Sequence, residues 1–376
     1  MVVDAVGLVA GGRRIAADRF VCTGSVALMA RVFVGMSGGV DSSVAAALLV
    51  EQGHEVTGVY MKNWSQDLPG MQCPWAEDLA DAKRVAVQLG IDFKVFDFET
   101  QYRQKVVDYM LDEYRAGRTP NPDIMCNQEV KFKLFLETSL AAGADYIATG
   151  HYTRVERLAD TARLLRARDD NKDQTYFLYR VTSEALAKTV FPLGNLTKPE
   201  VRQIAKDRGL WTARKKESMG VCFVGNVGMR EFLSQYIMTR PGDIIDKESG
   251  RVLGRHDGAI FYTLGQRHGL DVGGGLPYYV VGKNMDKNEV YVSRNINDEH
   301  IWRTEIKLTD IHWINQPLTE DTRIQVRLRH RGALINAIYS ADTLHLESAE
   351  RAVAPGQSAV IYRGEECLGG GIMSDI

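Results

Sequence analysis

The sequence lacks the cysteine patterns of metal sites and of disulfide-stapled folds. Its 376 residues include five cysteines: Cys22, Cys73, Cys126, Cys222 and Cys367. None forms a C-x-x-C pair or stands beside a histidine at metal-ligand spacing, which argues against structural zinc. An odd, scattered set in a chain of this length fits a reducing compartment, so we expect a cytoplasmic protein.

Long apolar runs and an excess of one charge sign are also missing. No apolar run approaches the ~20 residues that cross a bilayer, so no membrane partner is expected. The formal net charge is -2, with 45% hydrophobic and 25% charged residues, which is ordinary for a globular protein. A polyanion would therefore have to bind at a local basic patch. The length favours two or three domains.

Two common nucleotide-binding motifs are absent, but another kind of Gly-rich turn is present. Residues 32–43 read V-F-V-G-M-S-G-G-V-D-S-S, with neither Gly-Lys-Ser/Thr nor G-x-G-x-x-G. A short strand, a sharp turn and an Ala/Leu-rich helix would bring backbone N–H groups and a helix dipole together. The hydroxyls of Ser37, Ser42 and Ser43 add donors. This predicts a phosphate site; the alternative is a Ser/Gly turn without a ligand.

Strand and helix patterns alternate from residue 31 to about residue 150. Strands are predicted at 32–34, 55–61, 91–98 and 146–148, and helices at 44–50, 75–90, 101–115 and 131–142. Such alternation predicts a parallel sheet with helices on both faces. Because ligands lie beyond the carboxyl ends of such strands, we expect residues 37–43, 61–64 and 149–152 to share one rim.

A rigid polar loop is predicted at residues 117–127, which read G-R-T-P-N-P-D-I-M-C-N. Its two prolines fix the backbone and forbid helix. It carries Asp123 and Cys126 three residues apart, and the alternative is a loop with an incidental cysteine. Cys222 follows three basic residues, which would lower the pKa of its thiol. On local sequence alone, a buried inert cysteine is still the favoured interpretation there.

Two stretches stay ambiguous from their residues alone. Residues 171–178 place a polar cluster before an aromatic helix, which suits contacts to phosphate or base, or a solvated helix cap. Residues 325–331 are locally basic and suit either a phosphate-contacting face or a solvated strand face. Residues 197–200 read as a capping box that opens a helix.

From about residue 241, short β-type runs alternate with turn clusters, which predicts a small β-barrel. We therefore predict an α/β fold: a parallel sheet with flanking helices, a small central domain and a C-terminal β-barrel. The expected domains are 31–175, 176–240 and 241–376. Residues 1–30 are expected to be a disordered tail or the product of a start codon set too early, with a targeting peptide as the alternative.

Motifs along the chain resemble those of the MnmA-type tRNA-specific 2-thiouridylases, a family of ATP pyrophosphatases. They are G-M-S-G-G-V-D-S-S, Y-M-K-N-W, A-G-R-T-P-N-P-D-I-M-C-N, A-T-G-H-Y, N-K-D-Q-T-Y-F-L-Y, G-V-C-F-V-G, Y-T-L-G-Q-R and A-P-G-Q-S-A-V. The T-P-N-P-D-x-x-C loop paired with a distant G-V-C-F is the most specific part. The resemblance runs from about Arg31 to the C-terminus and implies an adenine nucleotide alpha hydrolase-like fold.

The resemblance also implies roles for individual residues. The expected ATP-binding residues are Gly35, Met36, Ser37, Gly38, Gly39, Val40, Asp41, Ser42, Met61 and Gly150, with Mg²⁺ near Asp41. The expected contacts to the target base are Asn121, Pro122 and Asp123, with Asp123 as general acid/base. The expected tRNA contacts are His151, Lys172, Asp173, Gln174, Arg329, His330 and Gln357.

The two incidental cysteines become a pair in this family. Cys126 would be the nucleophile and Cys222 the persulfide carrier, joined transiently as a Cys126–Cys222 disulfide, which reverses the local interpretation of Cys222. The implied activity is ATP-dependent 2-thiolation of the wobble uridine of tRNA, with tRNAs for Lys, Glu and Gln as acceptors. A cysteine desulfurase or sulfur relay protein would supply the sulfur.

Two other classes of function are open to the same chain. An amide ligase on this fold would explain the Gly-rich turn but not the two cysteines. A non-catalytic tRNA-binding protein would release no pyrophosphate when tRNA and ATP are added.

Overall fold

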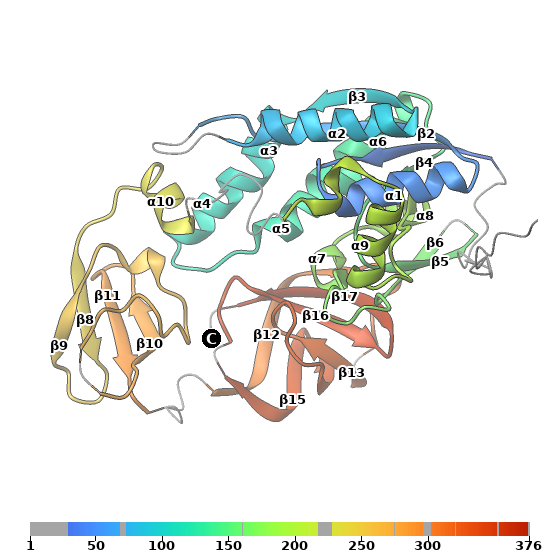
Figure 1. Cartoon of the computed structure of the whole chain (residues 1–376). Helices are drawn as coiled ribbons and strands as arrows, with labels where there is room; N and C mark the ends of the chain where they lie inside the picture. Colours follow the sequence, from blue (N-terminus) through green and yellow to red (C-terminus); the bar gives the residue numbers. More distant parts are fainter. Residues whose placement is uncertain are drawn as a thin grey trace, which may run out of the picture.

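The computed structural model describes residues 29–67, 73–159, 161–216, 228–273, 275–295, 302–319, 321–351 and 353–374. Their strands form a five-stranded, a four-stranded and an eight-stranded sheet, which Figure 1 shows as three distinct parts of the molecule. Within these described ranges, no helix combines the length and the apolar character that a membrane crossing needs.

The five-stranded sheet is parallel throughout, as the alternating pattern predicted. Its strand order is β3-β2-β1-β4-β7. The strands are β1 (Arg31–Gly35), β2 (Glu55–Lys62), β3 (Asp92–Asp97), β4 (Tyr146–Ala148) and β7 (Thr189–Val190). β2 and β3 are added on one side of β1, and β4 and β7 on the other, so the order in which strands are added reverses at β1 although all strands stay parallel. This switch point is where α/β sheets open a crevice for ligands.

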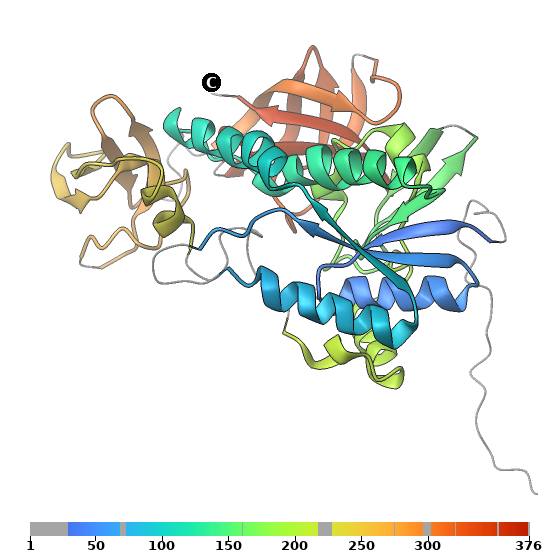
Figure 2. The ribbon, with the colours of Figure 1, turned by 90° about the horizontal axis from the view of Figure 1, so that it is seen from above.

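Helices cover both faces of this sheet (Figure 2). α1 (Val40–Glu51) and α2 (Trp75–Leu89) lie on one face. α1 is buried on nearly every side and consists largely of small apolar residues. Ala46 and Leu49 pack with the sheet, whereas Ala45 and Ala47 pack with the residues around α9 (Lys198–Asp207). A helix that is apolar all round is expected to be enclosed in this way.

Two helical rods cover the other face. The first comprises α3 (Glu99–Tyr102), the π-helical η1 (Arg103–Val107) and α4 (Asp108–Arg115); the second comprises α5 (Pro122–Met125), the π-helical η2 (Cys126–Leu134) and α6 (Phe135–Ala141). The prediction of a non-helical loop up to Asn127 is therefore wrong from Pro122 onward. Proline is tolerated at the first helical position because its missing N–H would have no partner there.

The segment between β4 and residue 216 ties the parallel sheet to its surroundings. It contains β5 (Arg154–Leu158), β6 (Thr161–Leu165), α7 (Thr175–Leu178), α8 (Ser183–Ala187) and η3 (Trp211–Arg214), besides β7 and α9. The predicted capping box at the start of α9 is confirmed, because the Glu200 side chain accepts from the Thr197 backbone N–H and the Thr197 side chain accepts from the Glu200 backbone N–H.

The four-stranded sheet follows α10 (Met229–Ser234). Its order is β10-β11-β8-β9, with β8 (Gly242–Asp246), β9 (Val252–His256), β10 (Tyr279–Asn284) and β11 (Glu289–Ser293). A 3₁₀ turn, η4 (Ala259–Phe261), lies between β9 and β10. Its core contains Ile244, Tyr262, Val280 and Val290 and is separate from the cores of the other parts.

The C-terminal β-barrel is confirmed. β12 (Trp302–Trp313), β15 (Thr343–Arg351), β14 (Ile335–Ser340), β13 (Thr322–Arg327), β16 (Ser358–Arg363) and β17 (Glu366–Met373) are hydrogen-bonded in that order, and β12 pairs back with β17 to close the barrel. The hairpin β5–β6 extends the same sheet, since β6 pairs with β17. The barrel is thus joined by backbone hydrogen bonds to the β5–β6 hairpin, which follows the parallel-sheet strand β4 in the chain.

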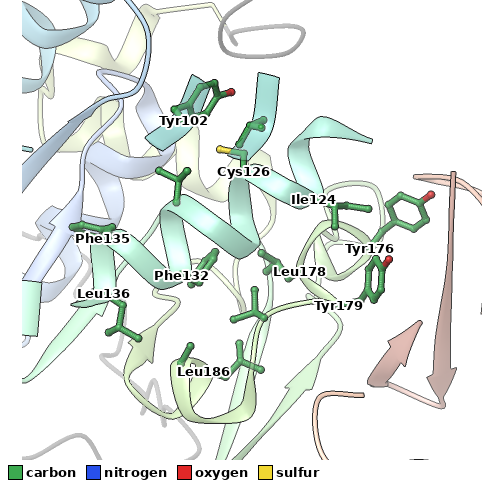
Figure 3. Close-up of a cluster of buried hydrophobic side chains, with 14 of the residues drawn as sticks. Tyr102, Ile124, Cys126, Phe132, Phe135, Leu136, Tyr176, Leu178, Tyr179 and Leu186 are labelled. Carbon is green, nitrogen blue, oxygen red and sulfur yellow. The ribbon is translucent and has the colours of Figure 1, made fainter. Parts of the chain in front are cut away.

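The largest core cluster lies between the second helical rod, α7, α8 and the barrel. Figure 3 shows Cys126, Phe132 and Phe135 on the rod, with Tyr176 and Tyr179 on the side of the barrel strands. All five side chains are buried.

Candidate active site

The Gly-rich turn joins β1 to α1 at the switch point. Ser42 sits in the first turn of α1, and its hydroxyl accepts a hydrogen bond from the Ser37 backbone N–H (3.2 Å) and lies 3.3 Å from the Ser37 hydroxyl. The N-cap residue of α1 is Gly39, which has no side chain to occupy the helix end. The first backbone N–H groups of a helix lack intrahelical partners, so this end is suited to an anion.

Close backbone approaches shape the turn. Gly38 has φ +72°, and a Cβ there would lie 2.3 Å from the carbonyl oxygen of Asp78. Gly150, directly after β4, packs so closely that a Cβ would lie 2.8 Å from the backbone nitrogen of Ser42. The Met61 side chain covers Gly35, where a Cβ would meet it at 2.9 Å. The structure therefore brings the predicted ATP residues of three separate segments to one rim of the sheet.

Asp41 is held by two residues that come from outside the turn. Lys198 Nζ, at the start of α9, lies 2.6 and 2.8 Å from the two carboxylate oxygens. The Tyr152 hydroxyl donates to the same carboxylate at 2.8 Å. The Lys198 side chain is 10% exposed and the Asp41 side chain 33% exposed, so this ion pair is partly shielded from water.

The predicted base-contacting residues open the second helical rod. Asn121 precedes α5, Pro122 is its first residue and is buried, and Asp123 is half-buried in its first turn. Burial raises the pKa of the Asp123 carboxyl, and the positive charge of Lys131 partly offsets that rise. A carboxyl group that gains a proton more easily than usual is suited to acid/base work on a ring.

Cys126 lies one helical turn after Asp123, at the start of η2. Its side chain is 2% exposed and packs among Tyr102, Ile124 and Val130. Figure 3 shows Cys126 and Ile124 on consecutive parts of the same rod. Its expected partner Cys222 lies outside the described residues.

Two of the expected tRNA contacts, His151 and Gln174, are bound to protein groups close to the turn. His151 is 8% exposed, its Nδ1 lies 2.8 Å from the Thr149 hydroxyl, and its ring packs on Phe132 and Phe191. Burial, with a smaller contribution from Lys131, holds the pKa of His151 well below its usual value, so the imidazole is neutral. The Gln174 side chain accepts a hydrogen bond from the Tyr152 backbone N–H at 2.8 Å.

Asp173 and Arg327 form a buried ion pair. The distance from Arg327 Nη1 to Asp173 Oδ2 is 2.9 Å, and the side chains are 6% and 0% exposed. Asp173 also accepts hydrogen bonds from the Thr175 hydroxyl and the Ala167 backbone N–H. The carboxylate therefore joins α7 to the barrel, and it is neither a solvated cap nor presented at the surface. Arg327 faces inward, which differs from both interpretations of the basic strand.

The other expected tRNA contacts lie farther out. Arg329 is exposed, and the half-buried His330 ring packs on Phe177 with ring centroids 4.5 Å apart. Lys172 helps to line a cavity of about 620 Å³ together with Lys198 and Arg202. The Gln357 side chain contacts the backbone just before Asn121.

Sequence reasoning missed Lys198 as a partner of Asp41, and it placed Tyr152 on the same rim without its hydrogen bond to Asp41. Lys198 was visible only as part of a helix cap, and it lies 157 positions from Asp41. No local sequence pattern links Lys198 to Asp41, so only the three-dimensional structure reveals this pair. Among the described residues, no group of three or more His, Cys, Asp or Glu side chains is placed to hold a metal ion.

Family models match nearly the whole chain. They are described as tRNA methyl transferase HUP domain for residues 30–226, tRNA methyl transferase PRC-barrel domain for residues 230–294 and Aminomethyltransferase beta-barrel domain for residues 303–373. The chain combines a parallel sheet that has a Ser/Gly turn at its switch point with two β-rich parts. It is thus an α/β protein of the HUP class.

Curated relatives identify the family within that class. Proteins named tRNA-specific 2-thiouridylase MnmA from Bacillus velezensis and Bacillus subtilis are each 48% identical to this chain, over 92% of it and 95% of the relative. The chain belongs to the MnmA family. A solved 4-thiouridine synthetase–RNA complex with bound ATP is 18% identical, with a TM-score of 0.33 over 55% of this chain and 50% of its own, which is too remote to support an argument.

Proposed function

We propose that this protein is a tRNA-uridine 2-sulfurtransferase that uses ATP to replace the C2 oxygen of the wobble uridine by sulfur. The observation that carries the proposal is the 48% identity over 92% of the chain to curated tRNA-specific 2-thiouridylases. The rim that joins Ser37–Ser42, Met61 and Gly150 supports it, because the reaction needs a pyrophosphate-binding turn.

The first step is adenylation of the base. The C2 oxygen of uridine attacks the α-phosphorus of ATP, the bond from that phosphorus to the β-phosphate oxygen breaks, and pyrophosphate leaves toward the N–H groups at the start of α1. Gly38 and Gly39 let the backbone approach the phosphates closely, and Ser37 and Ser42 add hydroxyl donors. Adenylation converts a poor leaving group at C2 into AMP, a good one.

Magnesium would offset the charge of the phosphates. Mg²⁺ was expected near Asp41, held directly or through water, and both Asp41 oxygens face Lys198 Nζ. A direct bond from Asp41 to a metal would require Lys198 to move, so this carboxylate fits an outer, water-mediated contact better than a direct one. The phosphates of ATP would supply most of the metal's ligands.

The second step is sulfur transfer from a persulfide on Cys222. Its terminal sulfur attacks C2, AMP leaves, and a disulfide links the base to Cys222. The Cys126 thiolate then attacks the Cys222 sulfur, which forms a Cys126–Cys222 disulfide and frees the 2-thiouridine. Alternatively, Cys126 attacks the persulfide first and releases hydrosulfide, which attacks C2. Either route consumes one persulfide from a donor protein and leaves a disulfide that a thiol reductant must reopen.

Asp123 and Asn121 are the residues proposed to act on the uracil ring. They flank Pro122 at the start of the rod that carries Cys126, so a base bound to them lies near the start of η2. The raised pKa of Asp123 suits a group that gives and takes a ring proton. Arg329, His330 and Lys172 are the proposed contacts to the RNA backbone.

Mass analysis of tRNA nucleosides tests the proposal. Unmodified tRNA for Lys, Glu or Gln is incubated with the protein, ATP, Mg²⁺ and a cysteine desulfurase with cysteine, and pyrophosphate is measured in parallel. We expect ATP-dependent 2-thiouridine with the wild-type protein and none with Cys126→Ser or Cys222→Ser, whereas Cys73→Ser serves as the matched control and retains activity.

The other classes of function give different results. Pyrophosphate release with a small carboxylic acid and an amine, but without tRNA, would indicate an amide ligase. Binding of tRNA with neither pyrophosphate nor 2-thiouridine would indicate a non-catalytic RNA-binding protein. Undiminished thiolation by both serine variants would end the two-thiol mechanism.

A further inference from the structure

Three parts of the molecule meet on residues 117–120, just before the proposed base contacts. From α4, Glu113 forms a bidentate ion pair with Arg118 at 2.6 and 2.7 Å. From the four-stranded part, the Thr263 hydroxyl lies 3.1 Å from the Thr119 hydroxyl. From the barrel, the carbonyl oxygen of Pro355 accepts a hydrogen bond from the Thr119 backbone N–H at 3.0 Å.

The Gln357 side chain adds to the barrel's hold on this segment. Its amide nitrogen donates to the carbonyl oxygens of Thr119 (2.7 Å) and Pro120 (3.3 Å). Gln357 was expected to contact tRNA, yet its donor group faces protein backbone in this structure. A single hydrogen bond of this kind makes a modest net contribution to stability, so the pair fixes the segment without dominating the stability of the fold.

Gly356 approaches the same segment without a side chain. Its φ is +88°, and a Cβ would lie 2.9 Å from both the Arg118 Cβ and the Thr119 nitrogen. Backbone atoms cannot give way as the end of a flexible side chain can. An alanine at residue 356 would therefore strain its own turn and push the segment at 118–119.

The turn that makes these contacts is itself fixed in the barrel. Gly356 donates its N–H to the Met373 carbonyl, and Met373 donates its N–H to the Gln357 carbonyl at 2.8 Å. At the next residue, Ser358, the carbonyl oxygen accepts a hydrogen bond from the Tyr176 hydroxyl at 2.9 Å. The Ser358 hydroxyl lies 3.1 Å from the Tyr179 hydroxyl. Figure 3 shows Tyr176 and Tyr179 between the barrel and the rod of Cys126. The turn is thus hydrogen-bonded to two tyrosines of the core cluster that also contains Cys126.

We propose that the barrel turn Pro355–Gln357 is a positioning element that sets the place of Asn121, Asp123 and Cys126. This inference rests on the proposed function of those residues. Prolines at 120 and 122 stiffen the connection, so a shift at Thr119 passes on to the start of α5. A displacement of ~1 Å at a reacting group can cost about 10²-fold in rate, whereas binding of the large RNA surface tolerates it.

Gly356→Ala tests the proposal, because glycine offers no side chain to RNA. We expect kcat for 2-thiouridine formation to fall at least about tenfold, with the Kd for tRNA, measured by filter binding, within about twofold of wild type. Gly364→Ala is the matched control: Gly364 has φ +61° in the β16–β17 turn, but a Cβ there meets nothing within 4 Å. It carries similar backbone strain and should leave both constants unchanged.

Gln357→Glu is the second test and covers the case in which Gly356→Ala does not fold. Glutamate has the size of glutamine but cannot donate to the carbonyls of Thr119 and Pro120. It should lower kcat with only a small fall in the thermal midpoint and an unchanged Kd, and Gln357→Asn, which keeps the donor on a shorter arm, should recover part of the loss.

Specific results would overturn the inference. An unchanged kcat in both Gly356→Ala and Gln357→Glu would remove the positioning role. A raised Kd at unchanged kcat would make Gln357 a direct RNA contact. If the wild-type protein forms no 2-thiouridine, the proposed function fails; if it does and the variants match it, only the positioning inference fails.

Discussion

Lys198 Nζ lies 2.6 and 2.8 Å from the two oxygens of Asp41, so a residue of α9 completes the Gly-rich turn between β1 and α1. The pair depends on the packing of α1 between the sheet and α9. It places a positive charge beside the proposed phosphate site that no residue of the turn itself supplies.

Lys198→Met is expected to reduce pyrophosphate release at least about tenfold, because it removes this charge and leaves Asp41 without its ion-pair partner. We also expect a loss of about 1–3 kcal/mol in the free energy of unfolding, smaller than for a fully buried pair because Asp41 is 33% exposed. Lys206→Met, at an exposed position of the same helix, is the control. Equal pyrophosphate release by the two variants would contradict the role of Lys198.

Arg327 and Arg329 are expected to give opposite results although they are two residues apart. Arg327→Met strands Asp173 in the core and should cost about 3–5 kcal/mol of unfolding free energy, measured by urea titration. Arg329→Met should change stability by less than about 0.5 kcal/mol but weaken tRNA binding and lower its salt slope by about one. An unchanged free energy of unfolding in Arg327→Met would show that the buried pair does not stabilise the contact between α7 and the barrel.

Replacing Asp123 by asparagine should lower turnover by about 10²–10⁴-fold while stabilising the fold near pH 7. The sign follows from the raised pKa: the folded state binds this proton more tightly than the unfolded state, so stability falls as pH rises from about 4 through the folded pKa. Asparagine removes that cost. Asp112→Asn, at an exposed position of α4, is the control. Loss of both activity and stability would indicate a structural role instead.

His151 is expected to make the protein less stable in mild acid. Its pKa is depressed in the fold, so the unfolded state takes up the proton first and stability is lost as pH falls below about 6.5, by about 1.4 kcal/mol per pH unit. His54, His256, His312 and His330 also have lowered pKa values and add to the same trend. Unfolding free energies at pH 7.5 and 5.5 should differ less for His151→Gln than for wild type; an identical difference would refute the assignment.

The sequence by itself determined the secondary structure around the Gly-rich turn and the order of the parts. Apolar runs at 32–34 and 146–148 and the amphipathic helices between them specify a parallel sheet, because local periodicity decides which faces are buried. It also pointed to Asp123 and Cys126 as neighbours on one segment. Pro122 was misread because a proline that opens a helix and one that breaks it look alike locally.

Only the tertiary structure decided which distant residues complete the site. Lys198 meets Asp41, Asp173 meets Arg327 and Gln357 meets Thr119 across separations of 157, 154 and 238 residues. Such contacts arise from the packing of whole elements, α9 on α1 and the barrel on the second helical rod, and a local sequence window carries no record of that packing. Short motifs therefore supply the residues proposed for the chemistry, whereas the packing of the sheet, the rods and the barrel sets the positions of those residues relative to one another.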